Sequence, residues 1–253
     1  MKKLKIFSLF FAGILVLAFV GVAMSGDLNK KSAVINVAYD YPIKPGTDAW
    51  KKLSSHDEML AAIQIPADVL KNMSTGALVQ TCLNYPLSGD MMVYDSLQQG
   101  LDEVISRSNC LQELLRRDDA GKELLVKYGD VGKQIQQDAG NIDSKKTNAT
   151  HYFEQTYVEM LLAQNSIRKN MSEDDEKALV KETLANYKLK QGRSDIYNFL
   201  DLQPSVLIMK NVLEKRNPGL IFGSKQASAG NQVTELFNNK DQIVSQAENF
   251  TSK

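Results

Sequence analysis

Apolar side chains recur at helical spacing through most of this chain, and that spacing restricts the fold more than any other feature. One stripe runs from Tyr94 through Leu101 to Ile105, and a second contains Leu111 and Leu114. A period of 3.6 residues places such side chains on one helix face, which must pack against other helices to leave water. Strand patterns are scarce after residue 50. The sequence therefore predicts an all-α fold of stacked short helices, loosely like an α-solenoid or a helical bundle.

Helix-start signals precede several of these stripes. Ser55 and Glu58 have the spacing of a capping box, in which each side chain satisfies a free backbone N–H of the other. Ser74 or Thr75 is a suitable N-cap for the next stripe. Ser172 precedes four acidic residues, which favour the positive end of a helix.

Changes in composition divide the chain into predicted parts. Prolines and a glycine near residues 42–46 predict an extended or irregular N-terminal arm, and a polar stretch with several glycines predicts a long loop after residue 128. We expect the second helical subdomain to pack on the first. The predicted parts are an arm over 26–54, a helical subdomain over 55–128, a polar loop over 129–149 and a helical subdomain over 150–253.

The C-terminal part contains breaks in the helical pattern. Pro204 separates two predicted helices, one over 195–200 and one over 204–215. Glycines and a proline predict a loop over 217–230. The last dozen residues are polar, and we expect them to fray.

Residues 1–25 have the pattern of a targeting segment. Three lysines precede an uncharged apolar run from Ile6 to Met24, and small residues flank a suitable cleavage point after Ser25. The run is also long enough for an N-terminal membrane anchor. Both alternatives, a cleaved signal peptide or an uncleaved anchor, place the rest of the chain outside the cytoplasm, either secreted or tethered to the outer face of the membrane, because the lysines stay inside. We expect membrane contact only through this segment.

The charge balance argues against a nucleic-acid binder. The chain carries 30 basic and 30 acidic residues, and loss of the leader would remove basic residues alone. Nucleic-acid binding needs a strongly basic surface, so we expect no nucleic-acid partner. The sequence also lacks the glycine-rich and metal-binding motifs of common cofactor sites, and we expect no cofactor.

The two cysteines, Cys82 and Cys110, both fall within apolar stripes. Cysteine in such a stripe behaves as a small buried hydrophobic residue. In an exported protein the two side chains could also form a disulfide, and a nucleophilic role is the third alternative. The sequence leaves these three alternatives open.

Two histidines are the weak candidates for chemistry. His56 begins a helix beside two acidic residues, and His151 lies three residues before Glu154, so that both side chains share a helix face. Either histidine could act as a base or a metal ligand. A complete metal site would need further ligands, and the sequence identifies no catalytic residue.

The stretches YPIKPGTDAWKKLSSHDEM, NMSTGALVQTCLNYPL and DSLQQGLDEVISRSNCLQELL resemble a group of exported bacterial proteins of unknown function, over residues 41–128. The resemblance implies a bacterial, secreted or surface setting. The sequence thus predicts a non-enzymatic, extracytoplasmic helical scaffold or binding protein whose partner is a protein, a peptide or a cell-envelope component. The alternative is an envelope-associated hydrolase with a site around His151 and Glu154, or around His56.

Overall fold

The computed structural model describes residues 33–138, 145–194, 197–223 and 229–252. Residues 33–253 form one compact unit. The predicted leader and the first residues of the arm, 26–32, lie outside the described residues. The described residues form helices and no β-strand, with one isolated bridge between Ile35 and Met73. The prediction of an all-α fold with an extended N-terminal arm is confirmed.

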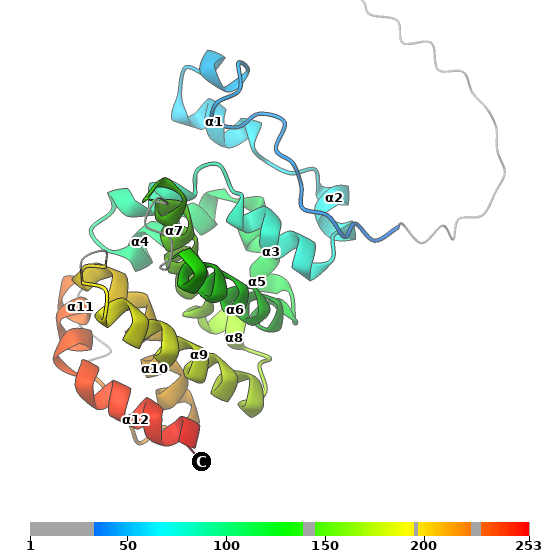
Figure 1. Cartoon of the computed structure of the whole chain (residues 1–253). Helices are drawn as coiled ribbons and strands as arrows, with labels where there is room; N and C mark the ends of the chain where they lie inside the picture. Colours follow the sequence, from blue (N-terminus) through cyan, green and yellow to red (C-terminus); the bar gives the residue numbers. More distant parts are fainter. Residues whose placement is uncertain (1–32, 139–144, 195–196, 224–228, 253) are drawn as a thin grey trace, which may run out of the picture. The chain divides into compact units, whose positions relative to one another are not determined.

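Short helices follow one another along the chain, and most connections between them are only a few residues long (Figure 1). The elements are η1 (Trp50–Lys52), α1 (His56–Ala62), α2 (Ala67–Asn72), α3 (Thr75–Leu83), η2 (Ser88–Val93), α4 (Leu97–Arg107), α5 (Asn109–Arg116), α6 (Ala120–Asp138), α7 (Lys145–Leu162), α8 (Asn165–Arg168), α9 (Glu173–Gln191), α10 (Phe199–Arg216), α11 (Ala229–Asn238) and α12 (Lys240–Ser252).

Serine N-caps start several helices, as their sequence spacing predicts. The Ser55 hydroxyl accepts a hydrogen bond from the Glu58 backbone N–H at 3.2 Å. The reciprocal half of the predicted capping box is displaced by one residue, because the Glu58 carboxylate accepts from the N–H of Ser54 at 2.7 Å. Ser172 and Asp175 form a complete capping box at the start of α9. The acidic run after Ser172 therefore has a structural role in starting this helix.

The N-terminal arm is held by backbone hydrogen bonds. The Ile35 N–H donates to the Asn72 carbonyl at 2.8 Å, and the Ser74 N–H donates to the Ile35 carbonyl at 2.9 Å. The Tyr39 N–H donates to the Thr81 hydroxyl at 2.9 Å. The arm thereby crosses the junction between α2 and α3.

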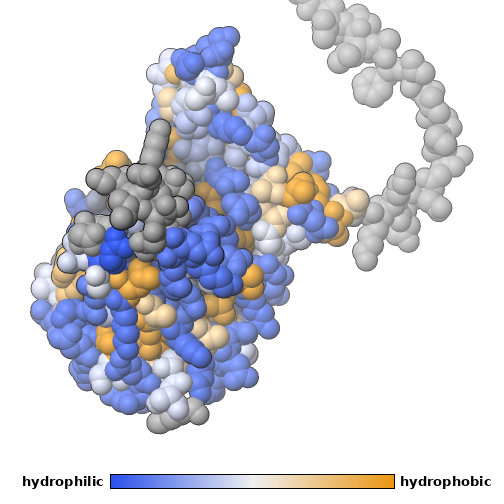
Figure 2. All heavy atoms as spheres, in the orientation of Figure 1, coloured by the Kyte–Doolittle hydropathy of each residue, from blue (hydrophilic) through white to orange (hydrophobic). Residues whose placement is uncertain are grey.

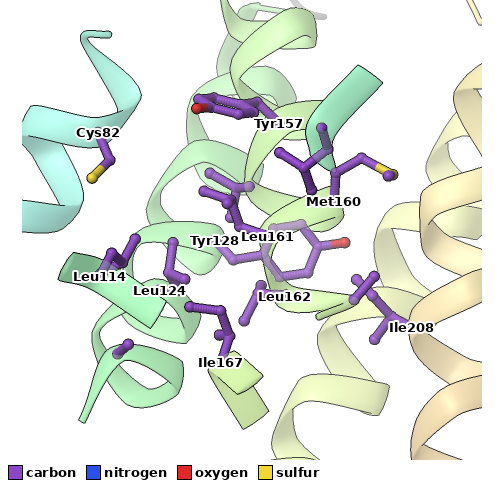
Figure 3. Close-up of a cluster of buried hydrophobic side chains, with 14 of the residues drawn as sticks. Cys82, Leu114, Leu124, Tyr128, Tyr157, Met160, Leu161, Leu162, Ile167 and Ile208 are labelled. Atoms are coloured by element: carbon purple, nitrogen blue, oxygen red, sulfur yellow. The ribbon is translucent and has the colours of Figure 1, made fainter. Parts of the chain in front are cut away.

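Helices α6 and α7 pack against each other at the centre of the fold (Figure 1). Helices α3 and α5 contact α6, whereas α9, α10 and α12 pack together. Helix α9 contacts α6, and α10 contacts α7. Figure 3 shows part of the core, where Tyr128 of α6 lies among Leu161 and Leu162 of α7 and Leu124 of its own helix. A single hydrophobic core extends from Tyr41 to Ala247 and therefore joins both predicted subdomains.

The predicted loop over 129–149 is wrong at most of its positions. Helix α6 continues to Asp138 and α7 already begins at Lys145, and residues 139–144 lie outside the described residues. Gly132 is inside α6 because α9 approaches closely there. A Cβ atom at this position would lie 3.2 Å from the Asn186 side chain. The glycine thus serves helix packing and does not mark a break.

Two predictions for the C-terminal part are also wrong. Helix α10 runs without interruption through Pro204, whose missing N–H leaves only the carbonyl of the exposed residue Leu200 without its helical donor. The predicted fraying end is helix α12, in which Ile243 and Ala247 are fully buried. Val244 and Phe250 also pack against the core, so an apolar face docks this otherwise polar helix on α9 and α10.

The surface in Figure 2 is mostly hydrophilic, with an apolar patch near α2. The arm contributes exposed apolar residues, since Val34 is 63% and Val37 is 72% exposed. In the part of the chain that the structure describes, no helix combines the length and the apolar character needed to cross a membrane.

Candidate functional site

His56 forms an exposed hydrogen-bonding contact with a carboxylate. Its Nε2 atom lies 2.7 Å from the Asp90 carboxylate in η2. The space beside Asp90 measures about 10 Å³, which holds about one water molecule. The contact links α1 to η2.

His151 and Glu154 both lie on α7, as the sequence spacing predicts. Glu154 forms an ion pair with Lys127 of α6, with a distance of 2.9 Å between Nζ and Oε1. Within the described residues, no group of three histidine, cysteine, aspartate or glutamate side chains is arranged to hold a metal ion. The predicted metal and catalytic candidates thus occupy separate surface contacts.

Cys82 of α3 and Cys110 of α5 are buried free thiols. The Cys110 sulfur contacts the Ser108 hydroxyl at 3.1 Å and receives a hydrogen bond from the Tyr41 hydroxyl at 3.5 Å. Burial raises the pKa of the Cys82 thiol well above its usual value. A thiol that is fully buried and protonated cannot reach a substrate as a nucleophile.

A buried polar network joins four helices around Glu159 of α7. The Glu159 carboxylate accepts hydrogen bonds from Tyr128 of α6 at 2.5 Å, from Lys190 of α9 at 2.6 Å and from Ser205 of α10 at 2.9 Å. Lys190 also donates to the Asp201 carbonyl at 3.0 Å and to Ser205 at 3.3 Å. Every proton of the ammonium group has an acceptor, so this network is a structural element.

A cleft of about 720 Å³ has room for a ligand. This volume is within the range of small-molecule sites in proteins. Its walls come from α4, the turn between α7 and α8, one face of α10, the loop after α10, and α11. The lining residues are Ser96, Gln98, Gln99, Asp102, Glu103, Ala163, Gln164, Asn165, Gln203, Leu207, Lys210, Asn211, Phe222, Gly223, Val233, Glu235 and Leu236.

Helical spacing brings the lining side chains together. On α10, Gln203, Leu207 and Lys210 follow one another at intervals of four and three residues, so they form one stripe along the helix. On α4, Gln98 and Asp102 share a face for the same reason. The stripes on α4 and α10 therefore form two of the walls of the cleft.

Two glutamine side chains fix the wall between α4 and the turn after α7. Gln98 and Gln164 exchange hydrogen bonds between their amide groups, each 3.1 Å long. Gln98 also donates to Asp102 at 2.9 Å, and Gln164 donates to the Met160 carbonyl at 2.8 Å. Each amide NH₂ group has two protons, so both groups have used all their donors inside the protein.

Gln203 differs from these paired amides. Its side chain lines the cleft and the residue is only 6% exposed, yet its amide makes no hydrogen bond to any described residue. The amide atoms themselves are open to water in the cleft, because none of them is among the fully buried side-chain atoms that lack a partner. An amide that faces a cleft and has no partner in the protein is available to a ligand.

The charges around the cleft are mainly acidic. Asp102, Glu103 and Glu235 line it, together with Lys210. The Lys210 charge is neutralised by Glu214, since the two groups lie 3.0 Å apart. Glu103 is paired with Arg107 at 3.0 Å. Among the described residues, no cationic side chain pairs with Asp102, so its charge faces solvent and the cleft.

Comparisons of this chain with protein-family models, with curated proteins and with solved structures give no match. The assignment of the candidate site therefore rests on the geometry of the cleft alone. Sequence reasoning missed it completely, because glutamine and asparagine residues on polar helix faces are common and form no motif. The sequence offers one weak signal, the position of Gln203 directly before Pro204 in a helix that contains many apolar residues.

Proposed function

We propose that this protein is a non-enzymatic, extracytoplasmic helical binding protein, and that its ligand occupies the cleft between α4 and α10. The observation that carries the proposal is the amide of Gln203, which makes no hydrogen bond to any described residue and lies at the wall of a cleft of about 720 Å³. The exported setting rests on the leader at residues 1–25 and on the resemblance to exported bacterial proteins. A binding role agrees with a cleft whose walls are preformed by paired amides.

Native mass spectrometry of the folded protein tests this proposal. The protein is incubated with a small-molecule extract of the host's envelope and culture medium, and its mass is measured under non-denaturing conditions. Leu207→Trp fills the cleft, and Val126→Trp adds the same bulk at a position on α6 that is 65% exposed and outside the cleft. We expect a non-covalent adduct on the wild type and on Val126→Trp, and none on Leu207→Trp. An adduct that persists on Leu207→Trp, or no adduct on the wild type, would contradict the proposal.

The hydrolase alternative is tested with the same samples. The double variant His56→Ala/His151→Ala removes both histidine candidates, and neither residue lines the cleft. The binding proposal predicts the same adduct on this variant as on the wild type. Conversion of a ligand by the wild type but not by the double variant would favour the hydrolase.

A further inference from the structure

We infer that Cys82 and Cys110 form a disulfide site, which closes when the protein folds in an oxidising compartment. The inference goes beyond the proposed ligand binding and shares with it only the extracytoplasmic setting, where disulfides form and persist. It rests on the contact between the two thiols and on the groups that surround them.

The two thiols meet where α3 packs against α5. The Cys82 thiol donates a hydrogen bond to the Cys110 sulfur, and the two residues are 0% and 1% exposed. A disulfide places its sulfur atoms about 2.05 Å apart and constrains both helices to a narrow range of separations. Two sulfur atoms that already share a hydrogen bond need only a short side-chain movement to reach that bond length.

The surroundings give the thiols no partner for other chemistry. The Cys110 sulfur contacts the Ser108 hydroxyl at 3.1 Å and the Tyr41 hydroxyl at 3.5 Å, and neither hydroxyl is a base that could activate a nucleophile. Zinc sites of this kind need further cysteine, histidine or acidic ligands, and the described residues contain no such group. The remaining reaction for two adjacent thiols is their oxidation to each other.

The bond would connect parts of the fold that are distant in sequence. Tyr41 of the arm donates both to Cys110 and to the Thr81 carbonyl beside Cys82, each at 3.5 Å, so the arm, α3 and α5 meet at the thiol pair. The loop between the two cysteines contains η2 and α4, and α4 forms one wall of the cleft. A disulfide across this loop restricts the unfolded chain and thereby stabilises the fold.

Thiol–disulfide exchange supplies the oxidant. The Cys110 thiolate attacks one sulfur of an oxidised dithiol and releases the other sulfur as a thiolate. The Cys82 thiolate then attacks the Cys110 sulfur of the mixed disulfide and releases the second donor thiolate. The two cysteines lose two protons and two electrons, and the electrons reduce the S–S bond of the donor. Because both sulfur atoms are buried in the folded protein, this exchange precedes the docking of α5 and the arm.

Refolding in a glutathione buffer tests the inference. The denatured and reduced protein is refolded with oxidised and reduced glutathione, denatured again, treated with iodoacetamide and weighed. We expect no alkyl group and a mass about 2 Da below that of the reduced chain, because two hydrogen atoms are lost. The same protein refolded with excess dithiothreitol should carry an alkyl group on both cysteines.

Thermal unfolding shows whether the bond fits the fold. The oxidised wild type should melt about 5 to 10 °C above the reduced wild type. Cys82→Ala and Cys110→Ala are matched controls that each keep one thiol, and each should melt at the same temperature in both buffers.

Two results would overturn the inference. In the first, both cysteines of the wild type are alkylated or carry glutathione after refolding in the glutathione buffer. In the second, the oxidised wild type melts no higher than the reduced protein. The native mass spectrum decides the binding proposal separately, because neither cysteine lines the cleft.

Discussion

The ammonium group of Lys190 lies 2.6 Å from the Glu159 carboxylate, and both side chains are fully buried. Tyr128 and Ser205 complete the contacts of this pair, and the Tyr128 hydroxyl in Figure 3 points toward α10. The network joins α6, α7, α9 and α10. It connects the two predicted halves of the chain through one specific set of contacts.

Removal of one partner should destabilise the protein strongly. Lys190→Met leaves the Glu159 charge buried without a counterion, and we expect a loss of about 3 to 5 kcal/mol in the free energy of unfolding. The double variant Lys190→Met/Glu159→Gln leaves no buried charge and should recover part of that loss. Urea unfolding followed by circular dichroism measures both values. A loss below about 1 kcal/mol in Lys190→Met would mean that water reaches the pair.

Stability should decrease at alkaline pH because several tyrosines are buried. Burial raises the pKa of Tyr85 to about 12, and burial together with the Glu159 charge raises the pKa of Tyr128 well above its usual value. Burial is also the main cause of the raised pKa of Tyr41, Tyr157, Tyr187 and Tyr197.

The direction in which stability changes with pH follows from the number of protons that the folded and the unfolded chain bind. Above about pH 10 the unfolded chain loses its tyrosine protons while the folded chain keeps them, so ionisation favours unfolding. The stability contribution is complete below pH 10 and is lost as the pH rises through the folded pKa values. Urea unfolding at pH 8, 10 and 11 measures the decrease, which should be smaller in Tyr85→Phe. Equal stability at pH 8 and 11 would contradict the burial of these hydroxyl groups.

The thiols should be unreactive in the folded protein. Burial keeps Cys82 protonated, and the Cys110 sulfur is enclosed by Ser108 and Tyr41. We expect no alkylation by iodoacetamide at pH 8 until the protein is unfolded. The number of alkyl groups added in denaturant then separates two free thiols from a disulfide between Cys82 and Cys110. Rapid alkylation of either residue in the folded state would restore the nucleophile hypothesis.

Gly100 of α4 lies against η2 without space for a side chain. A Cβ atom there would be 1.9 Å from the Met91 carbonyl oxygen, which belongs to the backbone and cannot rotate away. Gly100→Ala should therefore destabilise the protein by about 3 kcal/mol. Gly89→Ala is the matched control, because its Cβ would have no neighbour within 4 Å. Equal melting temperatures for the two variants would show that α4 and η2 are not in this contact.

The sequence predicted where most helices lie more reliably than where each helix begins and ends. Helical spacing and serine caps identified α3, α4, α5 and α9 because these signals are local. The glycines after residue 128 and Pro204 predict breaks, but both positions lie in continuous helices. Gly132 allows the approach of α9, and Pro204 leaves free only a carbonyl at the exposed residue Leu200.

The candidate site could not be predicted in the same way. Gln98, Gln164 and Gln203 are far apart in the chain, and only the packing of α4, α7 and α10 brings them to one cleft. The residues that stood out in the sequence, His56, His151 and Cys82, have structural partners or surface contacts. These residues are candidates in the sequence because histidine and cysteine side chains are chemically reactive. An amide without a hydrogen-bond partner can be recognised only when its neighbours in the structure are known.

The most direct test of the binding proposal is the free energy of unfolding of Gln203→Met in the absence of ligand. Methionine has a similar shape and needs no hydrogen bond, so replacement of an amide that makes no hydrogen bond within the protein should leave the stability unchanged to within about 0.5 kcal/mol. The same variant should lose the adduct in the native mass spectrum. A loss of about 1 kcal/mol or more in stability would show that the Gln203 amide is bonded within the protein, and the case for a ligand at this position would fail.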